Sequence, residues 1–368
     1  MKIAFLTNPT ELYADPPGGV QLCSQEFLKA FHSIGAVTIF DVHPTAHPWD
    51  RIRRKLLGAP YLSHNPMRES EVLESIKDFK PDIICINHCL LLRYARHLYF
   101  QNPTSKIIIL SHGNQSGDDL FECAHPSGRY FNTPRVAARI LGRSLIIESN
   151  TRHYHVDGVV VMSEEEEVFE RWMGSPATFV FPRIVQPLAT KRKPIINRVG
   201  FVGTLNHTPN SEALQRLLPI LASNGFDGEL RIVGGPVNDG QKIASQYAFV
   251  SYLGALDNQA LDAEANSWSI ALNPVFWLSR GASMKLKFLL NRGIPVITTK
   301  SGARGYKLPN GACIHTSDSA ADFAQVLIST LTNPDKLMKV ESVIRDTQTH
   351  WIKDSEVHGD LKGWIESL

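Results

Sequence analysis

The most informative stretch of this sequence is Gly281-Ala-Ser-Met-Lys-Leu-Lys-Phe-Leu-Leu-Asn-Arg-Gly-Ile-Pro-Val-Ile-Thr-Thr299. It is typical of a glycine turn, a short helix that stops at Gly293, and a buried strand. Ser283 is the expected N-cap, and Lys285 and Lys287 lie in the first turns of the helix. Because a helix N-terminus with nearby cations favours negative charge, this stretch predicts an anion-binding site.

The length and composition of the chain limit what it can be. Its 368 residues suggest two domains or one large one, and 43% hydrophobic residues suffice for ordinary α/β cores. A net charge of +2 is too small to indicate a nucleic-acid or membrane partner. The longest apolar runs fall short of the roughly 20 residues of a membrane-spanning helix. Residues 1–7 predict a first strand and no signal peptide, and the five cysteines suggest reduced thiols in a cytoplasmic protein.

Strand-like runs recur along the first half of the chain, with helix-like segments between them. The runs are apolar on both faces, as buried parallel strands are. This alternation predicts a doubly wound α/β sheet. The predicted strands are Lys2–Leu6, Val37–Val42, Asp82–Ile86, Lys106–Leu110, Gly158–Met162 and Thr178–Phe181.

The same pattern restarts after a basic segment that contains two prolines. Its predicted strands are Arg198–Gly203, Glu229–Val233, Phe249–Tyr252, Ser269–Asn273 and Pro295–Thr299. We therefore expect two Rossmann-like doubly wound domains that face one another across a cleft. The helical tail either crosses back onto the first domain or caps its own, and the sequence favours neither. The expected division is an N-terminal domain 1–183, a linker 184–197, a C-terminal domain 198–339 and the tail 340–368.

Two loops of the first domain carry candidate binding residues. Gly18 and Gly19 end the long loop after the first strand, which also contains Tyr13. Glycines there let the backbone approach a ligand, although a plain flexible loop would have the same composition. His112 and Asn114 directly follow the strand Lys106–Leu110, and ligands of such sheets bind at the carboxyl ends of strands. A structural histidine is the alternative.

Glycine turns also follow strands of the second domain. Gly203 and Thr204 lie between a predicted strand and a helix that starts near Pro209. Gly234 comes directly after the strand Glu229–Val233, and Leu253 lies at the following turn. A sheet strand followed by a tight turn, without any ligand, explains Gly234 and Leu253 equally well.

Taken in order, these segments resemble the GT-B glycosyltransferases of family 4, also described as glycosyl transferases group 1. The resemblance spans nearly the whole chain, is weak in the first domain and is most specific from Val199 to Tyr306. It implies transfer of a sugar from a nucleoside-diphosphate sugar to an acceptor, as in polysaccharide biosynthesis. It also implies retention of anomeric configuration and a reaction that needs no metal ion and no cofactor besides the nucleotide-sugar co-substrate.

The resemblance assigns roles to particular residues. It implies catalytic roles for His112, Lys285 and Arg280. It implies acceptor binding by Asn114 and Tyr13. It implies donor binding by Gly18, Gly19, Gly203, Thr204, Gly234, Leu253, Gly281, Ser283, Met284 and Lys287. Fixed cations and helix N–H groups would stabilise the charge that develops on the departing diphosphate.

The chain departs from the family at its Glu-x7-Glu motif. Alignment on Gly281 and Gly293 puts Arg280 at the first glutamate and Phe288 at the second. The second glutamate normally accepts hydrogen bonds from the ribose hydroxyls of the nucleotide, which a phenylalanine does not do. Another residue then holds the ribose, or the donor is held differently, or the protein is not an active transferase.

The acceptor is the least determined partner, with a glycan or a lipid-linked glycan expected. Trp49–Leu57 is basic and partly apolar, so it could contact the inner face of a membrane peripherally. A solvated surface helix is the plainer alternative. The same cations could touch DNA, although no nucleic-acid motif is present.

Two further hypotheses stay open. A catalytically inactive nucleotide-sugar-binding or regulatory protein would bind nucleotide without turnover. A different two-domain enzyme is the other hypothesis: a sugar epimerase would convert the nucleotide sugar without an acceptor, and a phosphorylase-like enzyme would need pyridoxal phosphate. Cys85, His88 and Cys89 have the residue types of a metal site, but no fourth ligand is evident, so no metal site is predicted.

Overall fold

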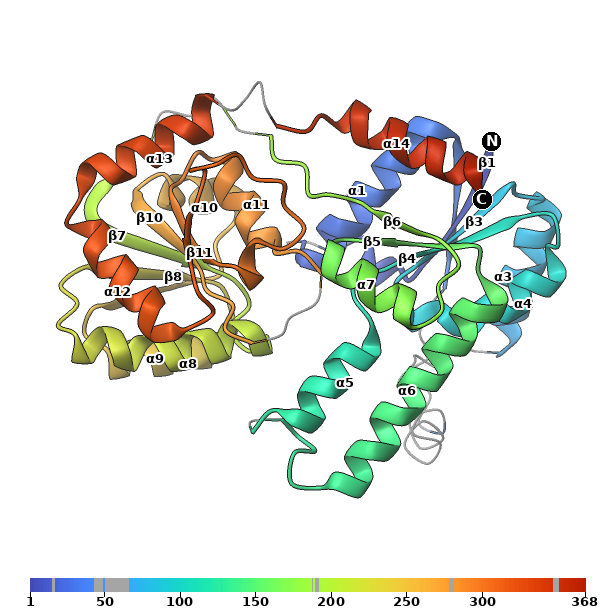
Figure 1. Ribbon diagram of the computed structural model, residues 1–368, viewed down its shortest axis with the longest axis horizontal. Helices are drawn as coiled ribbons and strands as arrows, with labels where there is room; N and C mark the ends of the chain where they lie inside the picture. Colours follow the sequence, from blue (N-terminus) through green and yellow to red (C-terminus); the bar gives the residue numbers. More distant parts are fainter. Residues whose placement is uncertain are drawn as a thin grey trace. The chain divides into compact units, whose positions relative to one another are not determined.

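The computed structural model describes residues 1–14, 17–42, 49, 66–126, 128–186, 188, 192–277, 281–346 and 351–368, with residues 66–69 described by their backbone alone. The chain divides into two compact units (Figure 1). The first unit comprises Met1–Pro182 together with Lys353–Leu368, and the second comprises Arg183–Ile352.

The first unit is built on a parallel six-stranded sheet with the strand order β2-β1-β3-β4-β5-β6. The order reverses between β1 and β3, which is the switch point where ligands of such sheets bind. β3 and β5 are fully buried, as expected for central strands covered on both faces. The strands are β1 (Lys2–Thr7), β2 (Ala36–Asp41), β3 (Ile83–Asn87), β4 (Lys106–Leu110), β5 (Gly158–Val161) and β6 (Thr178–Val180).

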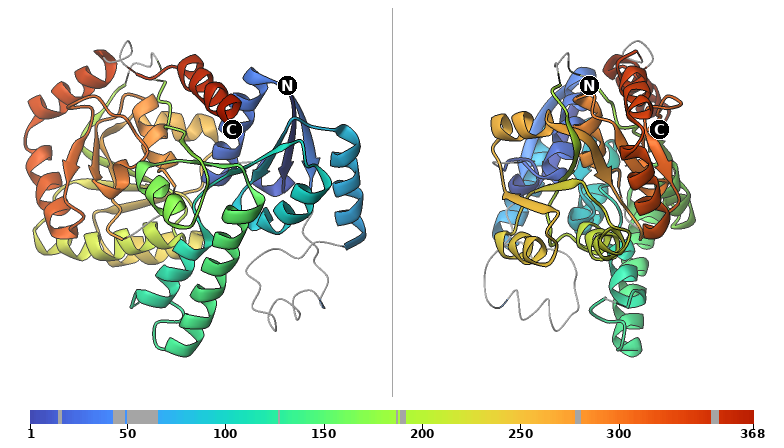
Figure 2. Two further views of the ribbon diagram at one scale, coloured as in Figure 1. Left: turned by 45° about the vertical axis from the view of Figure 1, so that its right-hand side comes forward. Right: turned by 90° about the vertical axis from the view of Figure 1, so that its left-hand side faces the viewer.

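Helices connect these strands, and two of them form a hairpin that projects from the sheet (Figures 1 and 2). The hairpin helices are α5 (Gln115–Ala124) and α6 (Pro134–His155). The other helices of the unit are α1 (Gly19–Ile34), α3 (Pro66–Phe79), α4 (Ala95–Gln101) and α7 (Glu164–Trp172), with short 3-10 turns η1 (Pro9–Glu11) and η2 (Cys89–Tyr94).

The expected tail is divided between the units. Its last part forms α14 (Asp354–Ser367), which packs against α1. Ser33 of α1 contacts His358 of α14, with 2.9 Å between Oγ and Nδ1, and the ring of Trp364 lies 5.6 Å from that of Phe179. Residues 340–346 instead continue a helix of the second unit.

The second unit contains another parallel six-stranded sheet, with the order β12-β11-β10-β7-β8-β9. Here the switch point lies between β7 and β10. The predicted fold class, α/β with two Rossmann-like sheets, is confirmed. The strands are β7 (Ile195–Val202), β8 (Glu229–Val233), β9 (Val250–Gly254), β10 (Trp268–Asn273), β11 (Val296–Thr299) and β12 (Ile314–Thr316).

The helices of this unit pack on one large apolar core. They are α8 (Thr208–Ser223), α9 (Val237–Gln246), α10 (Asn258–Ala265), α11 (Met284–Asn291), α12 (Ala320–Leu331) and α13 (Pro334–Asp346), with η3 (Ser301–Ala303). Trp268 is fully buried, and a Cβ on Gly200 would lie 1.9 Å from its ring, so only glycine fits there. None of the described helices in either unit combines the length and apolar character that crossing a membrane requires.

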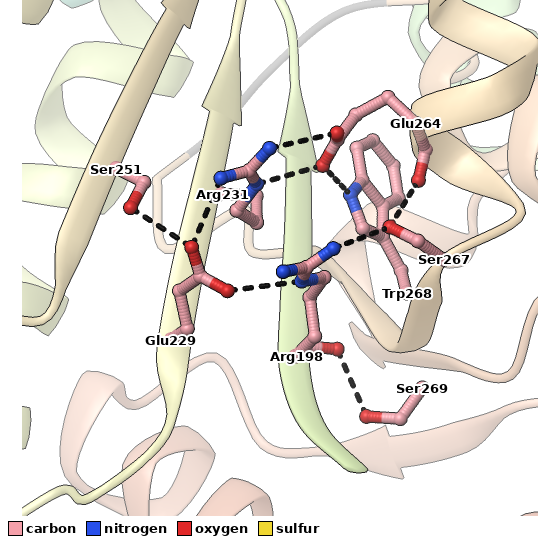
Figure 3. A network of polar contacts seen from close by, with 8 residues as sticks. All are labelled: Arg198, Glu229, Arg231, Ser251, Glu264, Ser267, Trp268 and Ser269. Atoms are coloured by element: carbon pink, nitrogen blue, oxygen red, sulfur yellow. Dashed lines mark hydrogen bonds and ion pairs between the residues drawn. The ribbon is translucent and has the colours of Figure 1, made fainter. Parts of the chain in front are cut away.

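A polar network joins the amino-terminal halves of β7, β8 and β9 to α10 (Figure 3). Arg231 donates two hydrogen bonds to the carboxylate of Glu264, at 2.8 and 2.9 Å, and one to Glu229 at 2.9 Å. Arg198 donates to the other oxygen of Glu229, and Trp268 donates its Nε1–H to Glu264. Because it lies away from the carboxyl ends of the strands, we interpret this network as structural.

Candidate functional site

Two glycine turns meet at the carboxyl edge of the second sheet. Gly203 follows β7 and donates its N–H to Val233 of β8, while Gly234 follows β8 and donates to Gly254. Gly234 has φ +138°, and a Cβ there would lie 2.0 Å from the carbonyl oxygen of Gly203. These two backbones therefore approach as closely as glycine allows, next to the switch point between β7 and β10.

The start of α11 is fixed beside the same edge. Ser283 caps the helix as predicted, since its Oγ accepts from the N–H of Leu286 at 3.4 Å. The same hydroxyl donates to Asn273, the last residue of β10, at 2.9 Å. The Tyr306 hydroxyl accepts from the N–H of Lys287 at 3.0 Å and donates to the carbonyl of Ser283. Thus the helix N-terminus is anchored to the strand on the other side of the switch point.

Lys285 brings the glycine turn and two helix starts together. Its ammonium donates to the amide oxygen of Asn210, in the first turn of α8, at 3.0 Å. It also lies 3.9 Å from the centre of the Phe201 ring, which is a cation–π contact. Its Cε lies 3.5 Å from the position that a Cβ of Gly203 would occupy.

The charge of Lys285 is poorly compensated in this position. No carboxylate among the described residues forms an ion pair with its ammonium. Burial lowers the pKa of Lys285 to about 7. A cation held without a carboxylate at a glycine turn is poised to take an anion as its missing partner.

The other residues predicted for the donor are distributed around this point. Thr204 is exposed, and its carbonyl accepts from Asn210 at 3.0 Å. Met284 and Lys287 are half-buried in the first turn of α11, and Gly281 precedes it with φ +68°. Leu253 is half-buried in β9 and packs against the core. Arg280, predicted to be catalytic, lies outside the described residues.

Phe288, at the position of the missing glutamate, packs against the core of the second unit. The Arg292 guanidinium lies 3.7 Å from the centre of its ring and is held there by Asp262, with 2.8 Å from Nε to Oδ1. Phe288 therefore has a packing role in the second unit.

His112 lies at the carboxyl edge of the first sheet, in a chain of hydrogen bonds. Asn87, which ends β3, donates its amide N–H groups to the hydroxyls of Thr7 and Ser24, both at 2.9 Å. Its Oδ1 lies 2.9 Å from Nε2 of His112. Because an amide oxygen only accepts, Nε2 of His112 is the donor in this contact.

His88 adjoins His112 at the switch point of this sheet, and Glu11 adjoins His88. The rings of His88 and His112 are 5.1 Å apart between centroids. His88 has φ +86°, an unusual backbone conformation for a residue with a side chain, and such strain clusters at functional sites. Oε1 of Glu11 lies 3.9 Å from Nδ1 of His88, and Oε2 is buried without a hydrogen-bond partner among the described residues. Burial raises the pKa of the Glu11 carboxyl to about 7.

The remaining predicted residues of the first unit have different surroundings. Gly18 and Gly19 are exposed at the start of α1, where Gln21 accepts from the Gly18 N–H at 3.0 Å. Tyr13 is 59% exposed. Asn114 is buried, and its Oδ1 accepts a hydrogen bond from Arg152, so it belongs to the base of the α5–α6 hairpin.

Sequence reasoning missed Asn210, Phe201, Asn87 and Glu11. Asn87 follows a predicted strand, and Glu11 lies in the loop singled out for its glycines, so strand-end position was the available signal. Within the described residues, no group of three or more His, Cys, Asp or Glu side chains could hold a metal ion. The expectation of a metal-independent site stays a prediction.

The chain is similar to known glycosyltransferases in one stretch of its sequence and in its fold. Residues 196–333 match the family model described as Glycosyl transferases group 1. No curated protein sequence matches the chain. Among solved structures, sucrose-phosphate synthase from Thermosynechococcus elongatus has a TM-score of 0.70 at 16% identity, covering 100% of this chain and 98% of that one.

Two further solved structures are similar over the full length. The Anabaena protein HepE in complex with UDP-glucose has a TM-score of 0.68 at 14% identity, covering 100% of both chains. The apo form of the lipopolysaccharide outer core galactosyltransferase WaaB has a TM-score of 0.58 at 14% identity, covering 100% of this chain and 99% of that one. At these identities the likeness concerns the fold.

Proposed function

From the GT-B fold of this chain, and the match of its residues 196–333 to the family model of group 1 glycosyl transferases, we propose that it moves a sugar from a nucleoside-diphosphate sugar to an acceptor. The second unit binds the donor, and the first unit binds the acceptor.

The observation that carries this proposal is the environment of Lys285. Its ammonium sits between Asn210 and the Phe201 ring, beside Gly203, with no ion-paired carboxylate among the described residues. A diphosphate would supply the missing negative charge, and the start of α11 would add its dipole.

The chemistry then needs little else from the donor site. The bond between the anomeric carbon and the diphosphate breaks, the acceptor hydroxyl oxygen bonds to that carbon, and the hydroxyl proton passes to the Glu11 carboxylate. The diphosphate leaves with its electron pair, and the negative charge that develops on it is stabilised by Lys285 and by the N-terminus of α11. Because these groups are fixed before reaction, they stabilise the charge without reorganisation. We propose that the reaction retains anomeric configuration and uses no metal ion.

On the acceptor side we propose a role for His112 and its neighbours. His112, oriented by Asn87, places its ring at the strand end, and Glu11 offers a carboxyl oxygen for an acceptor hydroxyl. The acceptor is a glycan or a lipid-linked glycan of the cytoplasm. Of the expected peripheral segment Trp49–Leu57, only Trp49 is among the described residues, and it is 70% exposed.

The experiment is a donor screen with purified protein. UDP-glucose is the first donor to test, since HepE was solved in complex with it. Release of nucleoside diphosphate that depends on an added acceptor, and that is lost in Lys285→Met, would support transfer. Sugar-nucleotide conversion without acceptor would instead indicate an epimerase.

A second candidate, a catalytically inactive nucleotide-sugar-binding or regulatory protein, is favoured by Phe288. Its ring is covered by Arg292, where the family has a ribose-binding glutamate. If the protein has this second function, nucleotide binding will need Lys285, and no acceptor will give a product. The same screen separates the two.

A further inference from the structure

The α5–α6 hairpin projects from the first unit on a firmly built base (Figures 1 and 2). Arg152 of α6 is fully buried and forms an ion pair with Glu170 of α7. Glu148, also fully buried, accepts from the backbone N–H groups of Gln115 and Ser116 at the start of α5. This buried network orients α6 relative to the sheet, so that its outer face has a defined direction.

That outer face carries a regular row of cations. Arg135, Arg139 and Arg143 follow one another at intervals of four residues, which puts them on one side of the helix. Arg135 and Arg139 are exposed and Arg143 is half-buried. None of the three forms an ion pair with any described carboxylate.

The acidic residues of the hairpin do not balance this row. Asp119 and Glu148 are buried, while Asp118 and Glu122 are half-buried on α5 or at its end. Asp119 is bound to Ser144, and Glu148 caps α5, so both face inward. The solvent-facing charge of the described hairpin is therefore positive.

Exposed apolar side chains continue the same row. Ile146 is 62% exposed and Tyr154 is 61% exposed, and helical spacing aligns both with the three arginines. We call this surface, made by Arg135, Arg139, Arg143, Ile146 and Tyr154, the arginine face. A helix of this length extends about 33 Å, so the face is long and narrow.

A second exposed aromatic cluster lies at the C-terminal end of α6, where helical spacing puts His155 on the side of the helix opposite the arginine face. Phe100 is 66% exposed and Tyr99 is 44% exposed. Their rings pack against each other at 5.5 Å and against His155, the last residue of α6, at 5.8 and 6.0 Å. This aromatic cluster is therefore not part of the arginine face.

We propose that the arginine face docks this protein onto an anionic lipid bilayer. The arginines would contact lipid phosphates, while Ile146 and Tyr154 would enter the boundary between headgroups and acyl chains. A helix that combines cations with exposed apolar and aromatic side chains has the properties of an interfacial membrane helix. The proposal does not depend on the transfer reaction, because membrane binding needs neither donor nor acceptor.

Other occupants fit the arginine face less well. A second copy of the chain would bring a second row of unpaired arginines against the first, and like charges repel. A nucleic acid would use the arginines but would leave the exposed Ile146 in water, and no nucleic-acid motif accompanies the row. Of these three occupants, the bilayer uses both kinds of side chain.

The test is co-sedimentation of the full chain with vesicles at low and moderate salt. The vesicles are pure phosphatidylcholine, or equal parts of phosphatidylcholine and phosphatidylglycerol. Each cation near an anionic surface contributes roughly fivefold to partitioning, so Arg135→Ala/Arg139→Ala/Arg143→Ala should weaken binding on the order of 100-fold. The matched control, Lys242→Ala/Lys300→Ala/Lys339→Ala, removes three exposed cations of the second unit and should bind like wild type.

A second variant tests the apolar part separately. Ile146→Ser/Tyr154→Ser keeps every charge and should reduce binding on the order of tenfold. Thermal unfolding should be unchanged in all variants, because the altered side chains lie largely in solvent. Failure of wild type to bind the mixed vesicles, or an equal loss in the lysine control, would overturn the proposal. So would a change of oligomeric state in the arginine variant without a change in vesicle binding.

Discussion

The ammonium of Lys285 donates a hydrogen bond to the side-chain oxygen of Asn210 across 3.0 Å. This contact ties the start of α11 to the start of α8, and both helix N-termini lie next to the switch point of the second sheet. Since an amide oxygen carries no full charge, the contact orients the ammonium without neutralising it. The lysine is thereby held ready for an anionic ligand.

Stability should depend on pH through Lys285. Its pKa of about 7 in the folded protein lies below the ordinary value of about 10.4. Between these values the unfolded chain binds a proton that the folded one does not, so stability rises with pH in this window. Below about pH 7 the folded state carries the full cost of the buried charge.

Replacing Lys285 with methionine removes that dependence. The free energy of unfolding of Lys285→Met, compared with that of wild type, should therefore be highest near about pH 6. This relative stabilisation should be lost near about pH 9.5. Urea unfolding of both proteins at the two pH values measures the difference. A stability difference that is the same at both would mean that the lysine keeps its ordinary pKa.

Gly234→Ala should be strongly destabilising. The new Cβ would meet the Gly203 carbonyl at 2.0 Å, and φ at this position is +138°. Backbone must move to relieve the clash, so we expect a loss of about 2–4 kcal/mol in the free energy of unfolding. Gly363→Ala in α14, with open space around it, is the control and should be neutral or stabilising. Equal melting temperatures for the two variants would contradict the close approach of the two turns.

Glu11→Gln should impair transfer without harming the fold. Glutamine keeps the shape but does not accept a proton, and we expect turnover to fall on the order of 100-fold. Because the folded-state pKa is raised to about 7, wild-type stability falls as pH rises from the ordinary glutamate value of about 4.3 towards 7. Glu11→Gln should lack this fall. Glu165→Gln, on the exposed face of α7, is the matched control. Full turnover in Glu11→Gln would remove Glu11 from the acceptor site.

The network of Figure 3 should contribute to stability and leave ligand binding unchanged. Arg231→Ala removes the partner of two carboxylates, and we expect a loss of about 1–3 kcal/mol in unfolding free energy. Hydrogen bonds from Arg231 hold the pKa of Glu264 below its usual value, so this contribution is present above about pH 4 and is lost on acidification. Nucleotide affinity, measured by calorimetry, should match wild type. A selective loss of affinity would assign the network to the site.

Much of the fold followed from sequence because buried parallel strands are apolar on both faces. Lys106–Leu110 and Glu229–Val233 have the predicted bounds, and α11 begins after its predicted cap. β12 was missed because it has three residues at a sheet edge, with His315 exposed in the middle. β7 begins at Ile195, inside the segment expected to be a linker, since its first residues are exposed and lack the apolar run of a central strand.

The site was less predictable, because it depends on contacts between distant residues. Lys285 stood out through helix position alone, but Asn210 and Phe201, which hold it, lie more than one predicted element away. Asn114 had the right strand-end position, yet it is committed to the buried Arg152, and burial of an arginine is not visible in a sequence. Local sequence patterns thus predict the carboxyl edge of a sheet, but they predict less well which side chains form the site at that edge.

The central claim, a diphosphate site at Lys285, is tested most directly by calorimetric titration of nucleoside diphosphates, UDP first, into wild type, Lys285→Met and the exposed-lysine control Lys300→Met. We predict that one diphosphate binds wild type and Lys300→Met equally. A ligand at 100 times its dissociation constant should also stabilise both by about 2.7 kcal/mol. Lys285→Met should fold normally and lose this binding. Binding that survives in Lys285→Met, or no binding of any nucleoside diphosphate to wild type, would contradict the account.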